Sequence, residues 1–244
     1  MSRVVAVIPV LNEAGAIGIT VAALPREVVN AVIVVDGGSS DATVTEARDA
    51  GAEVLVAPGP GYGRACAAGA ARAVELGAEV ALFLDGDGAD PAGQAERLVG
   101  PVLAGEADLV LASRTMGVRE PGSMGVHQVL AGRLAGGAIG LLTGVRYSDM
   151  SAFRAIRLEQ LVALGMREMT YGWNLEMQMR AARAGLRIRE VPLPYRRRLA
   201  GRSKVAGNLR GTLRAGLPII AVLLRVGLAR SGGADVRLSR TRER

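Results

Sequence analysis

The chain has 244 residues, which is long enough for one large domain or two small ones, and half of them are apolar, which allows a substantial core, although only 3% are aromatic. Its single cysteine, Cys66, excludes an intramolecular disulfide framework and fits a reducing, cytoplasmic compartment. The net charge of +7 is concentrated in residues 195–244, which carry thirteen Arg or Lys and two acids, and a basic end favours anionic partners such as diphosphates or lipid headgroups. Nucleic acid is disfavoured, because no zinc-ligand spacing, helix-turn-helix pattern or aromatic RNA-binding platform accompanies the charge.

Strand and helix patterns alternate over the first 113 residues. Short apolar runs predict buried strands at residues 4–8, 31–35, 54–57, 80–84 and 109–112. The segments between them predict helices at residues 14–24, 41–50, 63–76 and 91–103. This alternation predicts an α/β fold with a mostly parallel sheet and helices on both faces.

The pattern changes after residue 113. Residues 115–125 are rich in glycine and charge and predict a loop, followed by a helix at 127–143 and a strand-like segment at 145–156. A helix at 173–184, ending at a glycine, and a strand at 188–195 come next. The apolar run 216–228 is shorter than the roughly 20 residues that a membrane-spanning helix needs and contains Arg225. It either lies in a membrane interface or packs on the domain as a closing helix.

Two carboxylates follow the fourth apolar run directly, in Asp85-Gly86-Asp87. The carboxyl ends of the strands of an open α/β sheet are where ligands of such folds bind. There, both acids could reach one Mg²⁺ or Mn²⁺ ion that is completed by substrate phosphates. The alternative is a polar turn in which Asp and Gly serve the turn geometry alone.

Polar side chains also follow the first two apolar runs, at the same predicted edge. Asn12 and Glu13 could reach a base or ribose, and Asp36 could accept a hydrogen bond from the ring N–H of a nucleobase. The glycine-rich segment 61–64, which ends in Arg64, would let a nucleotide approach the backbone, although such a short pattern is weak when taken alone.

The sequence motifs described so far are followed along the chain by further motifs in its second half. The ordered set resembles a family-2 glycosyltransferase with the GT-A fold, on the dolichol-phosphate mannosyltransferase-like, polyprenyl-phosphate glycosyltransferase branch. The resemblance covers about residues 4–214 and rests on IPVLNE, VVDGGSSDAT, GYGRACAAG, FLDGDGADP, Ser113-Arg114, SDMSAFRAIR, YGWNLEMQMRAARAGLRIREVPLPYRRR and GRSKV.

The resemblance implies a nucleotide-sugar donor and a Mg²⁺ or Mn²⁺ cofactor, and it assigns roles to the matching positions. Donor binding falls to Pro9, Asn12, Glu13, Asp36, Arg64, Asp85, Gly86 and Asp87, of which Asp85 and Asp87 match the family's DxD metal motif. Contact with an acceptor phosphate falls to Arg114, Arg133 and Ser203. Catalytic roles are implied for Asp87, Arg114, Glu176, Arg202 and Lys204, with residues 202–204 in a basic loop over the phosphates.

The chain departs from the family pattern near the predicted metal. Gly37 stands where the family often has a second Asp, and Ala89 stands where a Gln can help to bind the metal. Asp90 either replaces that ligand or caps the helix after Pro91. The Ser-Ala pair at 151–152 replaces a common Gly-Pro, which weakens the predicted acceptor contacts there.

Other conspicuous residues are interpreted as structural. The only histidine, His127, lies in a loop or at the start of a helix. Trp173 and Met177, at i and i+4, are expected to pack in the core, and Cys66 to fill space in a helix of small residues. The three arginines at 196–198 are expected to form a solvated face.

The resemblance implies an inverting enzyme that moves a hexose from a nucleotide sugar, of the GDP-mannose or UDP-glucose type, to a polyprenyl phosphate. A phosphate acceptor is ionised near neutral pH, whereas an alcohol acceptor requires a base, for which Glu176 and Asp149 are the candidates. Transfer to a soluble acceptor and a non-catalytic nucleotide-sugar-binding module are the alternatives. Nucleotidyl transfer is disfavoured, because no glycine-rich loop bearing an Arg follows the first strand.

The expected organisation is a GT-A domain at residues 4–214, with a nucleotide-binding half at 4–113 and an acceptor half at 114–214. An apolar, membrane-interfacial or closing helix at 215–230 and a disordered basic tail at 231–244 follow. The expected location is the cytoplasm, peripheral on the cytoplasmic face of the membrane.

Overall fold

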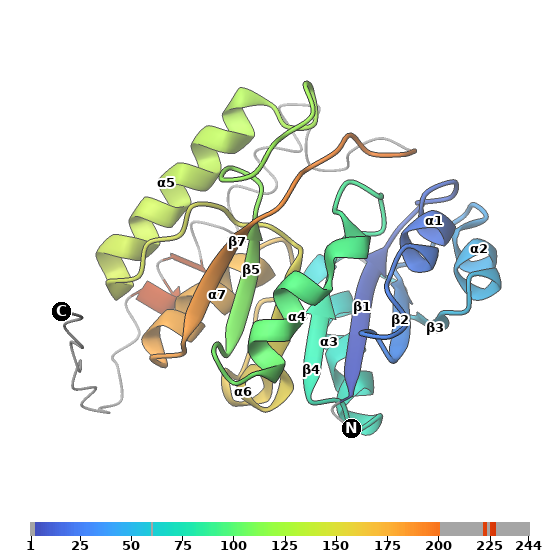
Figure 1. Ribbon diagram of the computed structural model, residues 1–244, viewed down its shortest axis with the longest axis horizontal. Coiled ribbons are helices and arrows are strands. Elements are labelled where there is room, and N and C mark those ends of the chain that lie inside the picture. Colours follow the sequence, from blue (N-terminus) through green and yellow to red (C-terminus); the bar gives the residue numbers. More distant parts are fainter. Residues whose placement is uncertain (1–2, 60, 201–221, 224, 228–244) are drawn as a thin grey trace.

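A seven-stranded sheet forms the centre of the protein, in a computed structural model that describes residues 3–59, 61–200, 222–223 and 225–227 (Figure 1). Its strands are β1 (Val4–Val10), β2 (Ala31–Asp36), β3 (Glu53–Val56), β4 (Val80–Phe83), β5 (Leu109–Ser113), β6 (Arg154–Arg157) and β7 (Ile188–Pro192). They lie in the order β3-β2-β1-β4-β6-β5-β7, and β6 runs antiparallel to both of its neighbours. The other four strand pairings are parallel, and this mostly parallel sheet confirms the predicted fold class.

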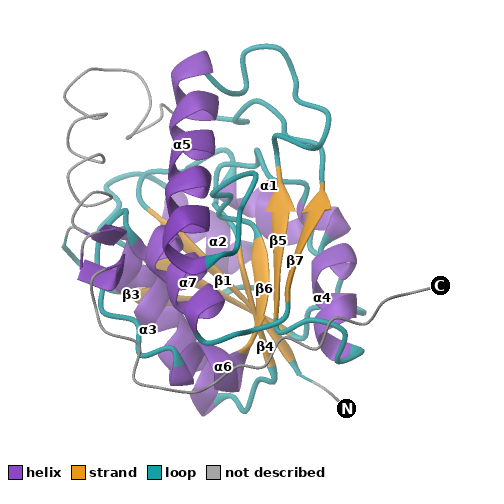
Figure 2. Cartoon of the chain, turned by 90° about the vertical axis from the view of Figure 1, so that its left-hand side faces the viewer, coloured by secondary structure: helices purple, strands orange, loops and turns teal. Residues whose placement is uncertain are grey.

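Helices cover both faces of the sheet (Figure 2). Helices α1 (Ile17–Ala22), α2 (Thr43–Asp49) and α4 (Glu96–Leu103) supply apolar residues to one core, with a 3₁₀ turn at Ala92–Gln94 before α4. Helices α3 (Tyr62–Glu75), α5 (Val126–Thr143), α6 (Leu158–Ala163) and α7 (Trp173–Arg183) supply the other. Alternate strand residues feed the two cores, as in β1, where Val4, Ala6 and Ile8 face one and Val5 and Val7 the other.

The predicted strand at residues 145–156 is wrong over most of its length. Only its end forms β6, and residues 145–153 are a loop whose polar groups are satisfied by side chains from elsewhere. The Ser148 backbone N–H donates to the Glu190 carboxylate at 3.0 Å, and the Gln178 amide donates to the Asp149 carbonyl at 2.9 Å. The short helix α6 that follows β6 was not predicted, because six residues give too little periodicity.

The described part of the C-terminal segment packs on the domain. Residues 222–223 and 225–227 are helical, and Val222 and Val226 are buried in the core that α5 and α7 share. Arg225 forms ion pairs with Glu168 at 3.2 Å and with Glu176 at 3.4 Å. The choice between a closing and a membrane-interfacial helix at 215–230 stays a prediction, because the rest of that helix and the basic tail lie outside the described residues. Every helix within the described ranges is too short or too polar to cross a membrane.

Candidate active site

The ends of β1, β2 and β4 bring the predicted donor residues to one edge of the sheet. The parallel register pairs Val10 with Asp36 and Val7 with Phe83, so the loops after these strands start side by side. Asn12 and Glu13 lie in the first loop, and Asp36 ends β2, as the sequence predicts. Pro9 is in β1, opposite Val35. The strand ends thus place the polar side chains at the edge where α/β folds bind ligands.

Asp36 and Asn12 tie the loops after β1 and β2 together. The buried Asp36 carboxylate accepts hydrogen bonds from the backbone N–H groups of Gly38 and Ser39, both at 3.0 Å. Asn12, at a positive φ of 52°, accepts the Ser40 N–H at 2.8 Å, and its own N–H donates to Ser39 Oγ at 2.8 Å. Both residues thus shape the loops; their contact with a nucleobase stays a prediction.

Arg198 bridges two acids that come from different strand ends. Its Nη1 donates to Asp87 Oδ2 at 2.7 Å, and its Nη2 donates to Glu13 Oε2 at 2.6 Å. The interpretation of residues 196–198 as a solvated face is therefore wrong for Arg198, whose side chain is only 27% exposed. Arg196 and Arg197 are exposed, as predicted. Only the third arginine turns inward, because the acids after β1 and β4 offer it two partners.

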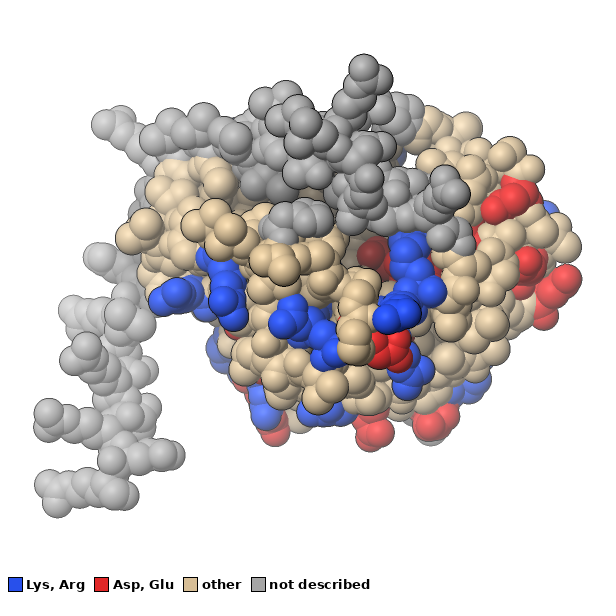
Figure 3. Space-filling view, turned by 90° about the horizontal axis from the view of Figure 1, so that it is seen from above, with Lys and Arg blue, Asp and Glu red and all other residues tan. Residues whose placement is uncertain are grey.

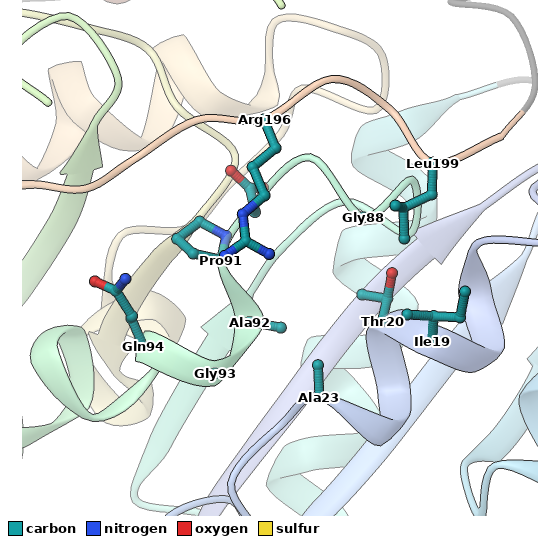
Figure 4. A pocket seen from close by; sticks show the side chains of 11 residues that line it. Ile19, Thr20, Ala23, Gly88, Pro91, Ala92, Gly93, Gln94, Arg196 and Leu199 are labelled. Carbon is teal, nitrogen blue, oxygen red and sulfur yellow. The ribbon is translucent and has the colours of Figure 1, made fainter. Parts of the chain in front are cut away.

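The chain after β7 is also tied to the Asp85–Ala89 loop through the backbone. The Leu199 N–H donates to the Asp87 carbonyl at 2.9 Å, and the Arg196 N–H donates to the Ala89 carbonyl at 3.0 Å. Gly88, at φ +75°, lies under Leu199, where a Cβ would be 2.3 Å from Leu199 Cδ1. Figure 4 shows Leu199 and Arg196 over a cavity of about 270 Å³ beside α1.

The acids at this edge are held in a setting that favours a bound cation. Burial, and next the neighbouring Asp87 charge, raises the pKa of Asp85 to about 7. Burial, and next the charges of Asp85 and Asp87, also raises the pKa of Asp90 well above its ordinary value. Figure 3 looks onto this edge and shows basic side chains gathered beside acidic ones.

The donor set fits a divalent cation that is completed by a substrate. Within the described ranges, no three acid, histidine or cysteine side chains are arranged to hold a metal by themselves. Asp85 and Asp87 offer hard carboxylate oxygens, and Mg²⁺ is commonly held by one or two carboxylates plus substrate phosphates. Asp90 makes no side-chain cap at the helical turn after Pro91, so the capping alternative for it is wrong.

Arg114 is fixed by a buried carboxylate. Its Nε donates to Asp149 Oδ2 at 2.7 Å and its Nη2 to Oδ1 at 2.8 Å, while its guanidinium lies 5.1 Å from the centre of the Tyr195 ring. Burial acts to raise the pKa of Asp149, but the Arg114 hydrogen bonds outweigh it and hold that pKa below its ordinary value. Arg133 is exposed on α5; its neighbour Gly132 faces Asp149, since a Cβ there would lie 3.8 Å from Asp149 Oδ1.

Glu176 lies in a separate network. Its fully buried carboxylate accepts the backbone N–H groups of Arg167 at 2.9 Å and Glu168 at 2.6 Å. Arg180 Nε donates to it at 2.9 Å, and Arg225 lies at 3.4 Å. Among the residues that the structure describes, no hydrogen bond joins this network to Asp87 or Arg198. The observed contacts of Glu176 fix the loop before α7, and its role near an acceptor stays a prediction.

Gly61, just before α3, and Gly63, in its first turn, serve a different purpose from the predicted one. A Cβ on Gly61 would lie 2.3 Å from the Met169 carbonyl oxygen, and one on Gly63 would lie 2.4 Å from that of Glu168. The Arg64 N–H donates to the Met169 carbonyl at 3.0 Å. The glycines therefore admit the backbone of the loop before α7, and their interpretation as room for a nucleotide is corrected.

This close approach gives a stability prediction. Gly63→Ala is expected to lower the free energy of unfolding by roughly 1–3 kcal/mol, because the new methyl group would overlap backbone atoms that cannot move independently. Gly137→Ala is the matched control: Gly137 lies within α5 with no atom outside its own helix within 4 Å of the added Cβ, and the change should stabilise by about 0.5–1 kcal/mol. Urea denaturation of both variants measures the difference, and equal effects would contradict the loop contact.

Several predictions about single residues are confirmed, and others fall outside the described chain. Trp173, Met177 and Cys66 are buried in the core, and burial raises the pKa of the Cys66 thiol. The predicted phosphate loop of Arg202, Ser203 and Lys204 lies outside the described residues. Sequence reasoning missed Arg198 as a site residue, although its position just after the last strand of the sheet was a usable signal.

Known proteins resemble this chain over most of its length. The family model for glycosyl transferase family 2 matches residues 5–161. An uncharacterized glycosyltransferase of Mycobacterium tuberculosis is 36% identical over 214 residues, which are 86% of this chain and 93% of that protein. The undecaprenyl-phosphate mannosyltransferase of Micrococcus luteus is 33% identical over 224 residues, which are 86% of this chain and 90% of that protein.

A solved structure extends the likeness to three dimensions. Glucosyl-3-phosphoglycerate synthase from Mycobacterium tuberculosis, in complex with Mn²⁺, UDP-glucose and phosphoglyceric acid, has a TM-score of 0.73 and 26% sequence identity. The match covers 95% of this chain and 82% of that one. It confirms the predicted GT-A type of α/β fold.

Proposed function

We propose that this chain, which belongs to glycosyl transferase family 2, transfers a hexose from a nucleotide sugar to a polyprenyl phosphate with inversion at the sugar carbon. The observation that carries the proposal is the convergence of Glu13, Asp87 and Arg198 at the sheet edge, beside Asp85. Relatives support its two halves: one is named an undecaprenyl-phosphate mannosyltransferase, and another was solved with Mn²⁺ and UDP-glucose.

Stabilisation of the leaving diphosphate is the chemical task of this edge. A divalent cation on Asp85 and Asp87 would neutralise charge on that group as the sugar bond breaks. Arg198 and the predicted loop of Arg202 and Lys204 would add fixed positive charge from the chain. Asn12 and Asp36 would orient the nucleotide by hydrogen bonds to its base and ribose.

A phosphate acceptor suits the residues on the other side of the site. Arg114 is a second cation near the acids, because its charge offsets part of the rise that burial and neighbouring carboxylates cause in the pKa of Asp85 and Asp90. It would draw an acceptor phosphate to the sugar carbon. Asp149 is held ionised by Arg114 and is therefore a weak base, as is expected where the acceptor oxygen carries no proton to remove.

Transfer to a soluble phosphorylated acceptor is the second candidate. The synthase that shares the fold was solved with phosphoglyceric acid, a small acceptor without a lipid chain. It also carries a phosphate that Arg114 could contact, but it offers a hydroxyl as well, and transfer to a hydroxyl would require a base. The two differ in whether the protein must work at a membrane surface.

A donor-by-acceptor screen tests the proposal. UDP-glucose and GDP-mannose are each incubated with a short polyprenyl phosphate or phosphoglyceric acid, with Mg²⁺ or Mn²⁺, and the products are identified by mass spectrometry. A sugar-phosphate-lipid product is expected. Product with phosphoglyceric acid alone selects the second candidate, and nucleotide binding without turnover across the screen indicates a non-catalytic module.

Sedimentation with vesicles separates the two acceptors by a physical route. We expect the full chain to sediment with anionic vesicles that contain prenyl phosphate. Exposed apolar side chains and basic side chains together favour binding to an anionic membrane surface. Vesicles of neutral lipid without prenyl phosphate are the control. Protein that stays in the supernatant with both vesicle types contradicts the lipid acceptor at the membrane.

A further inference from the structure

Arg198 forms ion pairs with acids that are expected to bind the donor and its metal ion. Its guanidinium joins Asp87, from the loop after β4, to Glu13, from the loop after β1. Asp87 Oδ2, which accepts from Arg198 Nη1 at 2.7 Å, is therefore engaged by a cation of the chain itself. Asp87 Oδ1 accepts the Ala89 N–H at 2.9 Å, so both oxygens of this carboxylate have a donor.

One N–H group of the Arg198 guanidinium has no hydrogen-bond acceptor in this arrangement, among the residues that the structure describes. Arg198 Nε is buried and finds no acceptor among the described residues, although a buried N–H that donates to nothing costs free energy. An arginine presents five N–H donors in a planar fork that suits the oxygens of a phosphate. The residue thus carries an unused donor at the same edge where a diphosphate is expected.

The side chain can leave the acids without disturbing the fold. The backbone on either side of Arg198 is fixed to the Asp85–Ala89 loop by the hydrogen bonds of Leu199 to Asp87 and of Arg196 to Ala89. The Arg198 side chain itself is 27% exposed and is held mainly by its two ion pairs. Rotation of this one side chain would free Asp87 while its anchor points remain.

We propose that Arg198 holds the place of the metal ion in the free protein and moves from the two carboxylates to the donor diphosphate when metal and donor bind. This inference rests on the proposed function. It makes the binding of metal and nucleotide cooperative, because the metal alone must displace Arg198, whereas a diphosphate gives the displaced guanidinium a new partner. Coupling between ligands of this kind typically changes affinity by about 5- to 150-fold.

Mn²⁺ binding without turnover tests the inference. Electron paramagnetic resonance counts free Mn²⁺ during titration of the full chain, alone and with UDP or GDP. Arg198→Gln should bind Mn²⁺ alone about tenfold more tightly than the unaltered protein, and the gain in Mn²⁺ affinity on adding nucleotide should shrink by a similar factor. Arg197→Gln is the matched control, since Arg197 is exposed and its Nε donates to the Pro121 carbonyl, and it should behave as the unaltered protein.

The outcomes separate this inference from the proposed function. Equal affinity of Arg198→Gln and the unaltered protein for Mn²⁺ alone overturns the role of Arg198, even if nucleotide promotes Mn²⁺ binding in both. Failure of Mn²⁺ to bind the unaltered protein with either nucleotide overturns the metal site itself. Arg198→Lys gives a second reading if the Gln variant is unstable: a point charge spans two carboxylates less well than a guanidinium, so its affinity for Mn²⁺ alone should fall between the two.

Discussion

Asp87→Asn is expected to lower kcat/KM for sugar transfer by roughly 10²–10³-fold or more, while the protein stays folded. The amide retains the size of the side chain and an oxygen that can accept the Ala89 N–H, but it removes the charge that would hold the cation on the donor diphosphate. Mass-spectrometric product rates with the best donor and acceptor pair measure the loss. Circular dichroism and the thermal midpoint check the fold.

Asp49→Asn is the matched control for this variant. Asp49 is an exposed carboxylate at the end of α2, so the same chemical change there should leave transfer unchanged. Undiminished turnover in Asp87→Asn would remove Asp87 from the metal site. Equal losses in the two variants would point to a general effect of charge rather than to a metal ligand.

Asp149→Asn is expected to destabilise the protein by about 3–5 kcal/mol, because it breaks a buried ion pair and leaves the Arg114 charge without its partner. The same change should reduce transfer, since Arg114 loses the two-point contact that orients it. Urea denaturation measures the stability. Asp108→Asn is the control. Asp108 pairs with Arg187, whose side chain is 57% exposed, so the loss of this ion pair should cost about 1 kcal/mol or less.

The pH dependence of stability follows from the same pair. The folded pKa of Asp149 is lowered, so its contribution is present above the unfolded value of about 3.9 and is lost as pH falls through the folded value. The stability difference between the unaltered protein and Asp149→Asn should therefore shrink below about pH 4. Activity lost without any loss of stability would instead indicate that Asp149 acts as a base.

Much of the nucleotide-binding half was predictable because each of its elements obeys a local rule. β1 and β4 are apolar throughout, β2 is apolar up to Asp36, and all three are almost entirely buried, which continuous runs of apolar residues indicate. The position of β6 was not predictable, since its antiparallel insertion between β4 and β5 depends on pairing with strands distant in sequence. The loop at residues 145–153 resembled a strand because polar and apolar residues are interspersed before β6, but Ser148 and Asp149 make contacts with Glu190 and Arg114 instead.

In the candidate site, too, residues that follow from a local sequence pattern could be predicted, and contacts between distant segments could not. Asp85 and Asp87 could be placed at the sheet edge from the end of one apolar run. The inward turn of Arg198 could not, because its partners Glu13 and Asp87 are 185 and 111 residues away in the chain. The glycines at 61 and 63 were misinterpreted for a similar reason, since the backbone that they admit comes from a loop more than 100 residues further on.

A crystal grown with Mn²⁺ and a nucleoside diphosphate, UDP or GDP, tests the central claim most directly. Anomalous scattering locates the manganese independently of the model of the protein. The account predicts one manganese peak between the Asp87 carboxylate and the diphosphate, with Asp36 facing the base and the Arg198 guanidinium turned from Glu13 to a phosphate oxygen. A nucleotide bound away from the ends of β1, β2 and β4, or a manganese peak remote from Asp87, would contradict it.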